Sequence, residues 1–216
     1  MTAILTRLVI ASSNAGKLAE FDDLFGGWFA GGGRMEIVAQ GALGVADADE
    51  TGLTFVENAL LKARHAARAT GLPALADDSG LCVDALDGAP GLHSARYSGV
   101  HGNASANIDT LLAALKGVPT AQRGAHFHAV IVLLRHAEDP QPLIAEGVWP
   151  GVILDARRGQ GGFGYDPVFL DPEYELSAAE IEPALKNRIS HRGRALAALR
   201  EKLALMPSWG RISFGG

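Results

Sequence analysis

The sequence predicts a mixed α/β fold, in which helices interrupt the strands of one sheet and some strands run antiparallel. Short β-branched runs are followed by segments with apolar residues three and four positions apart, the spacing of an amphipathic helix. Two apolar runs, at residues 127–134 and 144–152, follow each other as a hairpin-like pair. The length of 216 residues suits one domain, because single cores stop growing near about 250 residues.

The first strand is predicted at residues 8–13, a β-branched run that ends in polar residues. The turn after it contains Gly16, and Leu18, Phe21 and Leu24 then have helical spacing. Backbone N–H groups and the positive end of a helix attract anions, so this junction predicts a phosphate site. The string is not a Walker loop, because the Walker pattern is absent. A turn with an exposed lysine is the alternative interpretation. The predicted site consists of Ser12, Ser13, Asn14, Ala15, Gly16 and Lys17.

A second strand is predicted at residues 35–39, and a helix follows the acidic loop behind it. Thr54 and Glu57 form a capping box, in which a hydroxyl and a carboxylate each satisfy a backbone N–H at a helix start. Gly71 is typical of a left-handed C-terminal cap, so the helix should end near Thr70. One apolar stripe should pack on the sheet. The opposite face is predicted to carry Asn58, Lys62 and His65.

Two adjacent carboxylates, Asp77 and Asp78, precede Ser79 and Gly80 at an apparent break between apolar runs. Such runs predict buried strands, the second at residues 81–86, with the pair at a strand end, where ligand sites of open α/β sheets lie. Side chains alternate along a strand, so one carboxylate can face a pocket while the other turns toward scaffold or metal. An Asx-capped turn is the alternative.

The later elements are predicted from apolar spacing and glycine. A helix is expected over about residues 104–116, before the hairpin-like pair. A glycine-rich loop at 159–167 leads into a strand at 168–170. Ser190 can cap the last helix. The tail from residue 207 onward is glycine-rich and is expected to be frayed.

A second capping box predicts one more short helix. Ser177 and Glu180 have the Ser-x-x-Glu spacing that marks a helix start. Pro183 lacks a backbone N–H and should end or offset this helix.

Composition and charge exclude several classes of protein. The formal net charge is −5 and no run of five like charges occurs, so the basic footprint of a duplex nucleic-acid binder is missing. The only cysteine, Cys82, cannot form an internal disulfide, which fits a reducing compartment. No secretory signal is visible, and no stretch approaches the ~20 apolar residues of a membrane span. We expect a cytoplasmic protein that binds neither nucleic acid nor membranes.

A basic cluster and an aromatic loop suit a purine nucleotide. The cluster at residues 186–192 surrounds a Ser-capped helix start, which favours an anion or a polar base edge, with a solvated charge run as the alternative. The loop before the strand at 168–170 combines aromatics, glycine and a carboxylate, which suits a stacked purine, although aromatics entering a strand are often core. The residues singled out are Phe163, Gly164, Tyr165, Asp166, Lys186, His191 and Arg192.

Acidic residues predict a metal site and hydrolysis by water. Asp49, Glu50, Asp77 and Asp78 offer the oxygen ligands that Mg²⁺ prefers, and the ion would neutralise charge as a diphosphate leaves. One carboxylate could also deprotonate water. Cys82 is apolar in context and no Gly-x-Ser-x-Gly elbow occurs, so direct attack by water is favoured over a covalent intermediate.

Taken in order, these motifs resemble the non-standard purine nucleoside triphosphate pyrophosphatase family, the inosine and xanthosine triphosphate pyrophosphatases. The matching strings lie at residues 12–17, 50–52 with 54–59, 76–81, 88–91 with 94–97, 161–167 and 189–192. The resemblance implies an elongated, two-lobed α/β domain with a mixed sheet and a central cleft over residues 1–206, followed by a flexible tail at 207–216. It also implies a homodimer.

The activity implied by the resemblance is hydrolysis of ITP, dITP or XTP to the monophosphate and pyrophosphate, with Mg²⁺. The catalytic acid–base position falls on Asp78. The metal positions fall on Asp78 and Asp49, where the family commonly has Glu, so Glu50 is an alternative ligand. Triphosphate contacts fall on residues 12–17 and on Lys62. Further substrate contacts fall on Ser79, Phe163, Gly164, Tyr165, Asp166, Lys186, His191 and Arg192.

Base selectivity has a physical rationale in this sequence. Hypoxanthine and xanthine carry a 6-oxo acceptor where adenine has an amino donor, so backbone N–H, His191 or Arg192 donors would favour them. Guanine shares the 6-oxo group, and the sequence shows no feature that rejects it. Two rival functions are a regulatory module that binds nucleotides without hydrolysis, and a pyrophosphatase for modified pyrimidines or for dUTP and dTTP.

Overall fold

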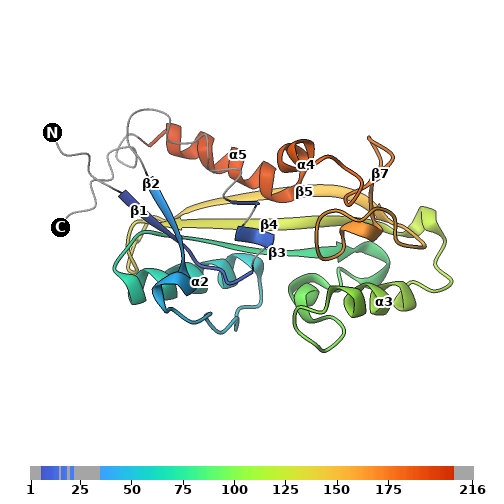
Figure 1. The fold of residues 1–216 in the computed structure, drawn as a ribbon, viewed down its shortest axis with the longest axis horizontal. Helices are drawn as coiled ribbons and strands as arrows, with labels where there is room; N and C mark the ends of the chain where they lie inside the picture. The colour runs from blue at the N-terminus through green and yellow to red at the C-terminus, as the bar shows by residue number, and fades with distance from the viewer. Residues whose placement is uncertain (1–5, 15, 19, 22–34, 207–216) are drawn as a thin grey trace. The chain divides into compact units, whose positions relative to one another are not determined.

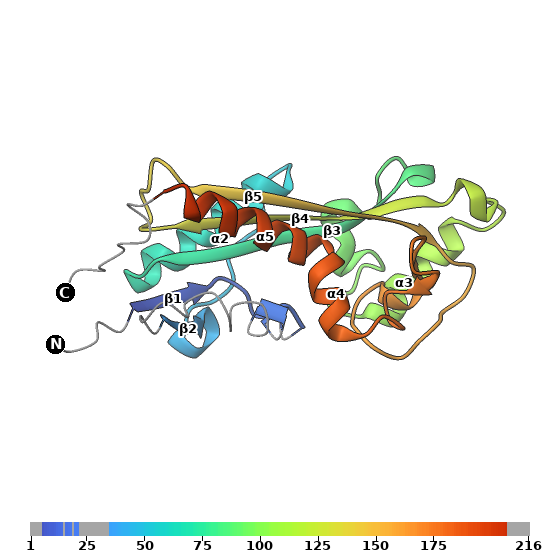
Figure 2. The same ribbon diagram turned by 90° about the horizontal axis from the view of Figure 1, so that it is seen from above.

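The computed structural model describes residues 6–14, 16–18, 20–21 and 35–206. Its strands form one seven-stranded sheet (Figure 1; Figure 2). Strand β1 is parallel to β2 and β3, whereas β6 is antiparallel to β5 and β7. The sheet is therefore mixed, as predicted. In their order across the sheet, the strands are β2 (Met35–Ala39), β1 (Thr6–Ile10), β3 (Ala74–Val83), β4 (Gly124–Leu134), β5 (Leu143–Ile153), β6 (Phe169–Asp171) and β7 (Leu176–Ser177).

Helices separate the first strands along the chain, whereas β4 to β7 follow one another without an α-helix between them. Residues 16–18 and 20–21 are helical, so this helical segment begins within the predicted phosphate loop. In the described part of the chain no helix is both long and apolar enough to cross a membrane. The longer helices are α2 (Phe55–Thr70), α3 (Ala104–Ala114), α4 (Pro183–Ile189) and α5 (His191–Ala204). The predicted tail at 207–216 lies outside the described residues.

The chain divides into two compact units, each with its own hydrophobic core. The first unit comprises Met1–Asp78, Val130–Glu146 and Ala195–Gly216, and the second comprises Ser79–Ala129 and Gly147–Arg194. In the first, an alanine face of α2 packs against β1, β3 and β4. Within this unit, α2 and the later part of α5 lie on opposite faces of the strands (Figure 1). In the second, α3 packs on an aromatic cluster from β4, β5 and β6.

Local signals define the ends of α2 as predicted. Thr54 Oγ1 accepts a hydrogen bond from Glu57 N, and the Glu57 carboxylate accepts from Leu53 N and from the Thr54 hydroxyl. These hydrogen bonds lower the pKa of Glu57, led by that from Thr54. Gly71 ends the helix in the left-handed conformation, with φ of 68°. The capping box and the glycine cap are confirmed.

The prediction of two strands around the carboxylate pair is wrong. Asp77 and Asp78 lie in the middle of β3, a single strand that runs through Gly80 to Val83. Gly80 lies inside the strand and does not break it. Its lack of a side chain lets another segment of the chain pack closely against β3. A Cβ there would lie 2.3 Å from the carbonyl oxygen of Gly91, so only glycine permits this close approach.

The predicted helix at Ser177 is also wrong. The Glu180 carboxylate accepts a hydrogen bond from Ser177 N at 2.8 Å, but the chain continues as a turn after β7. Pro183 begins α4 instead of ending a helix, since a first-turn N–H has no intrahelical acceptor and its loss costs little. Glu182 is the N-cap residue of α4 and accepts from Leu185 N. Ser190 caps α5 as predicted, accepting from Gly193 N.

Candidate active site

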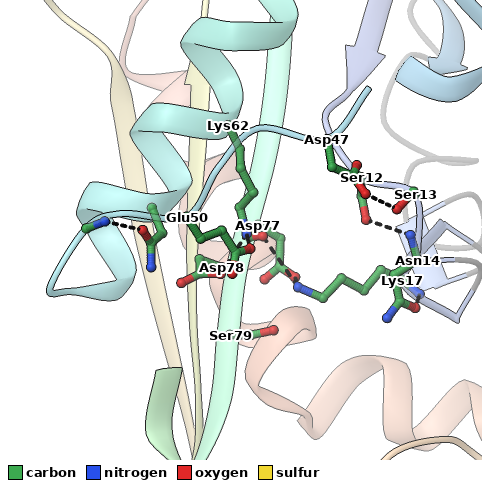
Figure 3. A network of polar contacts seen from close by, with 12 residues as sticks. Ser12, Ser13, Asn14, Lys17, Asp47, Glu50, Lys62, Asp77, Asp78 and Ser79 are labelled. Atoms are coloured by element: carbon green, nitrogen blue, oxygen red, sulfur yellow. Dashed lines mark hydrogen bonds and ion pairs between the residues drawn. The ribbon is translucent and has the colours of Figure 1, made fainter. Parts of the chain in front are cut away.

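Strand β3 brings two buried carboxylates into the first unit. Asp77 is 1% exposed and Asp78 is 7% exposed. Adjacent side chains of a strand point to opposite faces, so the two carboxylates meet different neighbours. Burying a carboxylate is costly unless a cation and hydrogen bonds compensate it. Each of these two carboxylates pairs with a lysine (Figure 3).

Lys62 joins two of the predicted site carboxylates. Its Nζ lies 2.6 Å from Asp78 Oδ1 and 3.0 Å from Glu50 Oε1 (Figure 3). Helix α2 supplies the lysine, strand β3 supplies Asp78, and the loop before α2 supplies Glu50. Glu50 lies 12 positions before Lys62 in the sequence and Asp78 lies 16 positions after it, yet both carboxylates hold the same ammonium.

The environment sets the charge of this pair. Burial raises the pKa of Asp78, and Glu50 raises it further, while Lys62 and Lys17 lower it without cancelling the rise. Burial lowers the pKa of Lys62, but attraction from Asp78 and Glu50 outweighs burial, so the lysine pKa is raised. Lys62 therefore keeps its charge, and Asp78 has the raised pKa that suits an acid–base group.

Lys17 pairs with the other carboxylate of the strand. Its Nζ lies 2.6 Å from Asp77 Oδ2 and 3.4 Å from the Asp77 carbonyl oxygen. The loop before it is closed by local hydrogen bonds, from Lys17 N to Asn14 Oδ1 and from Asn14 N to Ser12 Oγ. Ser12, Asn14, Gly16 and Lys17 thus lie together as predicted, and Ala15 lies outside the described residues.

Sequence reasoning missed two residues that hold these loops. Asp47 accepts hydrogen bonds from the Ser13 hydroxyl and from the side-chain amide of Gln40. Asn58 is buried, although it was predicted on the polar face of α2, and its Oδ1 accepts from Gly52 N at 2.8 Å. The signal for Asn58 was its place beside the alanines of the apolar stripe. For the contact of Asp47 with Ser13 no local signal exists, since the two residues are 34 positions apart in the sequence.

A second cluster lies in the second unit, around Phe163. Lys186 Nζ lies 2.7 Å from Asp166 Oδ2, and both residues are buried. The same Asp166 oxygen accepts from Phe163 N at 2.7 Å. The ammonium of Lys186 lies 5.2 Å from the centre of the Phe163 ring, and the guanidinium carbon of Arg192 lies 5.4 Å from it. Two cations thus contact one aromatic ring.

The two basic residues at the start of α5 are buried in this unit. Arg192 Nη2 donates to Ser79 Oγ at 2.7 Å. The His191 ring is stacked on Phe127, with ring centres 4.8 Å apart and planes 13° apart. It also faces Trp149 at 6.5 Å. His191 therefore belongs to the aromatic core as well as to the predicted base site.

Tyr165 is placed differently from Phe163. Its ring is 4% exposed and belongs to the core, and its hydroxyl donates to the carbonyl oxygen of Ser94 at 2.9 Å. Burial raises its pKa well above that of an ordinary tyrosine. Gly164 has a φ of 62°, a conformation that glycine adopts without strain, and it lets the loop turn between these aromatics.

Comparison with known proteins decides the family. The model of the Ham1 family matches residues 8–202. The chain belongs to the Ham1 family. Among curated relatives, the dITP/XTP pyrophosphatase of Xanthomonas oryzae pv. oryzae is 65% identical over 92% of this chain and 98% of its own length. That of Shigella flexneri is 55% identical over 92% of this chain and 98% of its own length.

Solved Ham1-family structures share this fold. A HAM1 protein from Coxiella burnetii is 47% identical, covers 93% of this chain and 100% of its own, and superposes with a TM-score of 0.83. A dITP/XTP pyrophosphatase from Mycobacterium abscessus is 42% identical, covers 94% of this chain and 100% of its own, and has a TM-score of 0.70. The predicted family and its mixed α/β fold are confirmed.

The chemistry of the first cluster suits a hard cation. Its acidic ligands are oxygen donors, and Glu50 and Asp78 already hold one cation, the Lys62 ammonium, between them. No group of three or more His, Cys, Asp or Glu side chains gathers as a metal site among the described residues. Mg²⁺ usually binds through one or two carboxylates plus substrate phosphates, so this carboxylate pair fits it. Asp49 is exposed and makes no contact with this pair among the described residues.

Proposed function

We propose that this Ham1-family chain hydrolyses the non-standard purine nucleoside triphosphates dITP, ITP and XTP to the monophosphate and pyrophosphate. The observation that carries the proposal is the buried Asp78, which has a raised pKa and contacts a lysine that also holds Glu50. Relatives that are 65% and 55% identical over nearly their whole length are dITP/XTP pyrophosphatases. Cleansing the nucleotide pool is the cellular role that this activity supports.

In the proposed reaction Asp78 is the general base. Its carboxylate accepts a proton from water, and the water oxygen bonds to the α-phosphorus. The bond from the α-phosphorus to the oxygen that bridges to the β-phosphorus then breaks, and pyrophosphate leaves with that oxygen. A raised pKa favours this role, because a base works best when its pKa lies close to the operating pH.

Positive groups of the first unit would bind the triphosphate. Lys17 and Lys62 supply point charges, and the backbone of residues 12–17 precedes a helical segment, where N–H groups suit phosphate oxygens. Ser12, Ser13, Asn14, Ala15 and Gly16 are the proposed loop contacts. Charge-assisted contacts of this kind are the stronger ones, and they become more favourable as charge develops on the leaving group.

We propose Mg²⁺ as the cofactor, with Glu50 and Asp78 as the carboxylates that would hold it. Asp49 stays a candidate from the sequence. When bound, the ion supplies positive charge that offsets the charge of the phosphates. Lys62 already contacts both carboxylates, at 3.0 Å from Glu50 Oε1 and 2.6 Å from Asp78 Oδ1.

The second unit supplies the proposed base recognition. Phe163 offers a half-buried ring, and Lys186 and Arg192 offer donors beside it. A 6-oxo group accepts hydrogen bonds from such donors, whereas the amino group of adenine leaves them unsatisfied. The remaining proposed substrate contacts are Ser79, Gly164, Tyr165, Asp166 and His191. Of these, Tyr165 and His191 lie in the core of the second unit. We further propose a cytoplasmic homodimer of one two-lobed domain.

One assay tests the function and separates its rivals. Purified protein with Mg²⁺ is given dITP, ITP, XTP, ATP, dUTP and dTTP, and pyrophosphate and orthophosphate are measured separately. We expect pyrophosphate from the first three substrates and little from ATP. Orthophosphate instead of pyrophosphate would place the cut at the wrong bond. Binding without turnover would favour the regulatory module, and turnover of dUTP or dTTP alone would favour a pyrimidine pyrophosphatase.

A further inference from the structure

We propose that Asp77 is a positioning residue for the hydrolysis, which holds the ammonium of Lys17 at strand β3 and itself touches neither substrate nor metal. This inference rests on the proposed function, because Lys17 is a proposed triphosphate contact. The sequence left two roles open for the second carboxylate of the pair, toward scaffold or toward metal. The structure favours the first.

The contact geometry ties Lys17 at both ends. Its Nζ lies 2.6 Å from Asp77 Oδ2 and 3.4 Å from the Asp77 carbonyl oxygen. Its backbone N donates to Asn14 Oδ1 at 3.1 Å. A lysine side chain has four rotatable carbons, so an ammonium is well placed only when a partner restricts it. Here the partner is a residue of β3, an interior strand of the sheet (Figure 3).

Burial separates the roles of the two residues. The Asp77 side chain is 0% exposed, whereas that of Lys17 is 15% exposed. A ligand arriving from solvent therefore meets the lysine and not the carboxylate. Removing one partner of a buried ion pair leaves the other charge uncompensated, so the position of Lys17 depends on Asp77. The side chain of the neighbouring residue, Asp78, points to the opposite face of the sheet and pairs with Lys62.

Because Asp77 acts through Lys17, replacing either side chain removes the same placed ammonium from the proposed triphosphate site. The effects of substitutions at two residues in direct contact do not simply add. The split of the loss between kcat and KM should therefore be the same for both residues, which a loss of stability alone would not produce.

The test is a pair of substitutions and their combination, Asp77→Asn, Lys17→Met and both together, with kcat and KM for dITP measured for each. We expect kcat/KM of each single variant to fall on the order of tenfold to 100-fold, because a displaced group costs about this much. We expect kcat and KM to change in the same proportions in both single variants. The double variant should be no worse than Lys17→Met, since Asp77 acts only through Lys17.

A matched control separates positioning from stability. Asp139 is another buried carboxylate of the first unit, paired with Arg135 at 2.8 Å, and it lies outside the site. Asp139→Asn should lower the melting temperature and leave kcat and KM for dITP unchanged. Should Asp77→Asn fail to fold, Asp77→Glu tests the proposal in its place. It keeps the charge but moves the carboxylate, so it should lower kcat/KM, and combining it with Lys17→Met should add no further loss.

Several results would overturn the proposal. They are wild-type kinetics in Asp77→Asn, a split between kcat and KM in Asp77→Asn that differs from that in Lys17→Met, losses that multiply in the double variant, and a higher Mg²⁺ requirement in Asp77→Asn than in Lys17→Met. The last would make Asp77 a metal ligand. Failure of the proposed function looks different, because the wild-type protein would then release no pyrophosphate from dITP or XTP.

Discussion

The two polar clusters of this Ham1-family chain differ in the sign of their charge. In the first unit three carboxylates, Glu50, Asp77 and Asp78, meet two lysines. In the second unit one carboxylate, Asp166, meets Lys186, and Arg192 adds a further cation at the same aromatic ring. An excess of carboxylates suits a metal ion and the activation of water, whereas an excess of cations beside a ring suits carbonyl acceptors of a base.

This difference predicts that substitutions in the two clusters have different kinetic consequences. Changes in the first cluster should lower kcat and move the pH profile, because they alter the proposed base and the charge at the phosphates. Changes in the second should alter KM and the choice of base. The predictions below test that division, beginning with the largest expected effect.

Asp78→Asn should abolish turnover and leave binding intact. The amide keeps the size of the carboxylate but cannot take a proton from water, so we expect kcat to fall by about 10²–10⁴-fold. Calorimetry with IMP should still show binding. Pyrophosphate release measures the loss. A variant that keeps a tenth of the wild-type rate would remove Asp78 from the role of base.

Lys62→Met should lower kcat/KM on the order of 100-fold, because it removes a charge placed at the phosphates. It should also move the acid limb of kcat/KM to higher pH, since the lysine lowers the pKa of Asp78. In the wild type that limb should already lie above the range of an ordinary aspartate, because burial raises the pKa. An acid limb that moves to lower pH in Lys62→Met would contradict this assignment.

Glu50→Gln should weaken the binding of Mg²⁺ by about tenfold to 100-fold. The affinity is measured by direct titration of the ion in the presence of IMP, and also by activity. The same titration on Asp49→Asn compares the two candidate ligands. Glu50 contacts the lysine held by Asp78, whereas among the described residues no hydrogen bond or ion pair joins Asp49 to that lysine, so Glu50 should have the larger effect. A larger effect at Asp49 would reverse the assignment.

Arg192→Lys should reduce the preference for ITP over ATP by about tenfold, because lysine keeps the charge but loses the planar fork of donors. The acid limb should stay where it is. Arg194→Lys is the matched control. Arg194 lies on the same helix, and at the exposed surface it donates hydrogen bonds to the carbonyl oxygens of Ile189 and Val148. Equal changes in the two variants would make the effect one of helix stability.

The sequence was sufficient where a signal is local. The strand at 35–39 and the ends of α2 follow from a β-branched run, the Thr54–Glu57 capping box and Gly71, and all three stand as predicted. The local rule failed at Ser177, where a capping-box pair forms its hydrogen bond without a helix. It also failed at Gly80, where the glycine does not mark the end of a strand. A glycine is needed there because Gly91 packs closely against the strand.

The site was predictable as a set of residues and not as a set of contacts. Motif order placed Lys17, Lys62 and Asp78 among the candidates, and the structure brings each of them into one of two adjoining ion pairs. Which lysine meets which carboxylate depends on the alternation of β3 and on helices distant in sequence. The pairing of Lys17 with Asp77, and the contact of Asp47 with Ser13, follow from tertiary structure alone.

The most direct test of the account is a crystal structure of the Asp78→Asn variant with dITP and Mg²⁺. The account predicts that the α-phosphorus lies beside residue 78, with a water molecule between them in line with the bond to the leaving pyrophosphate. Phosphates bound away from residue 78, or a γ-phosphorus in that place, would contradict it.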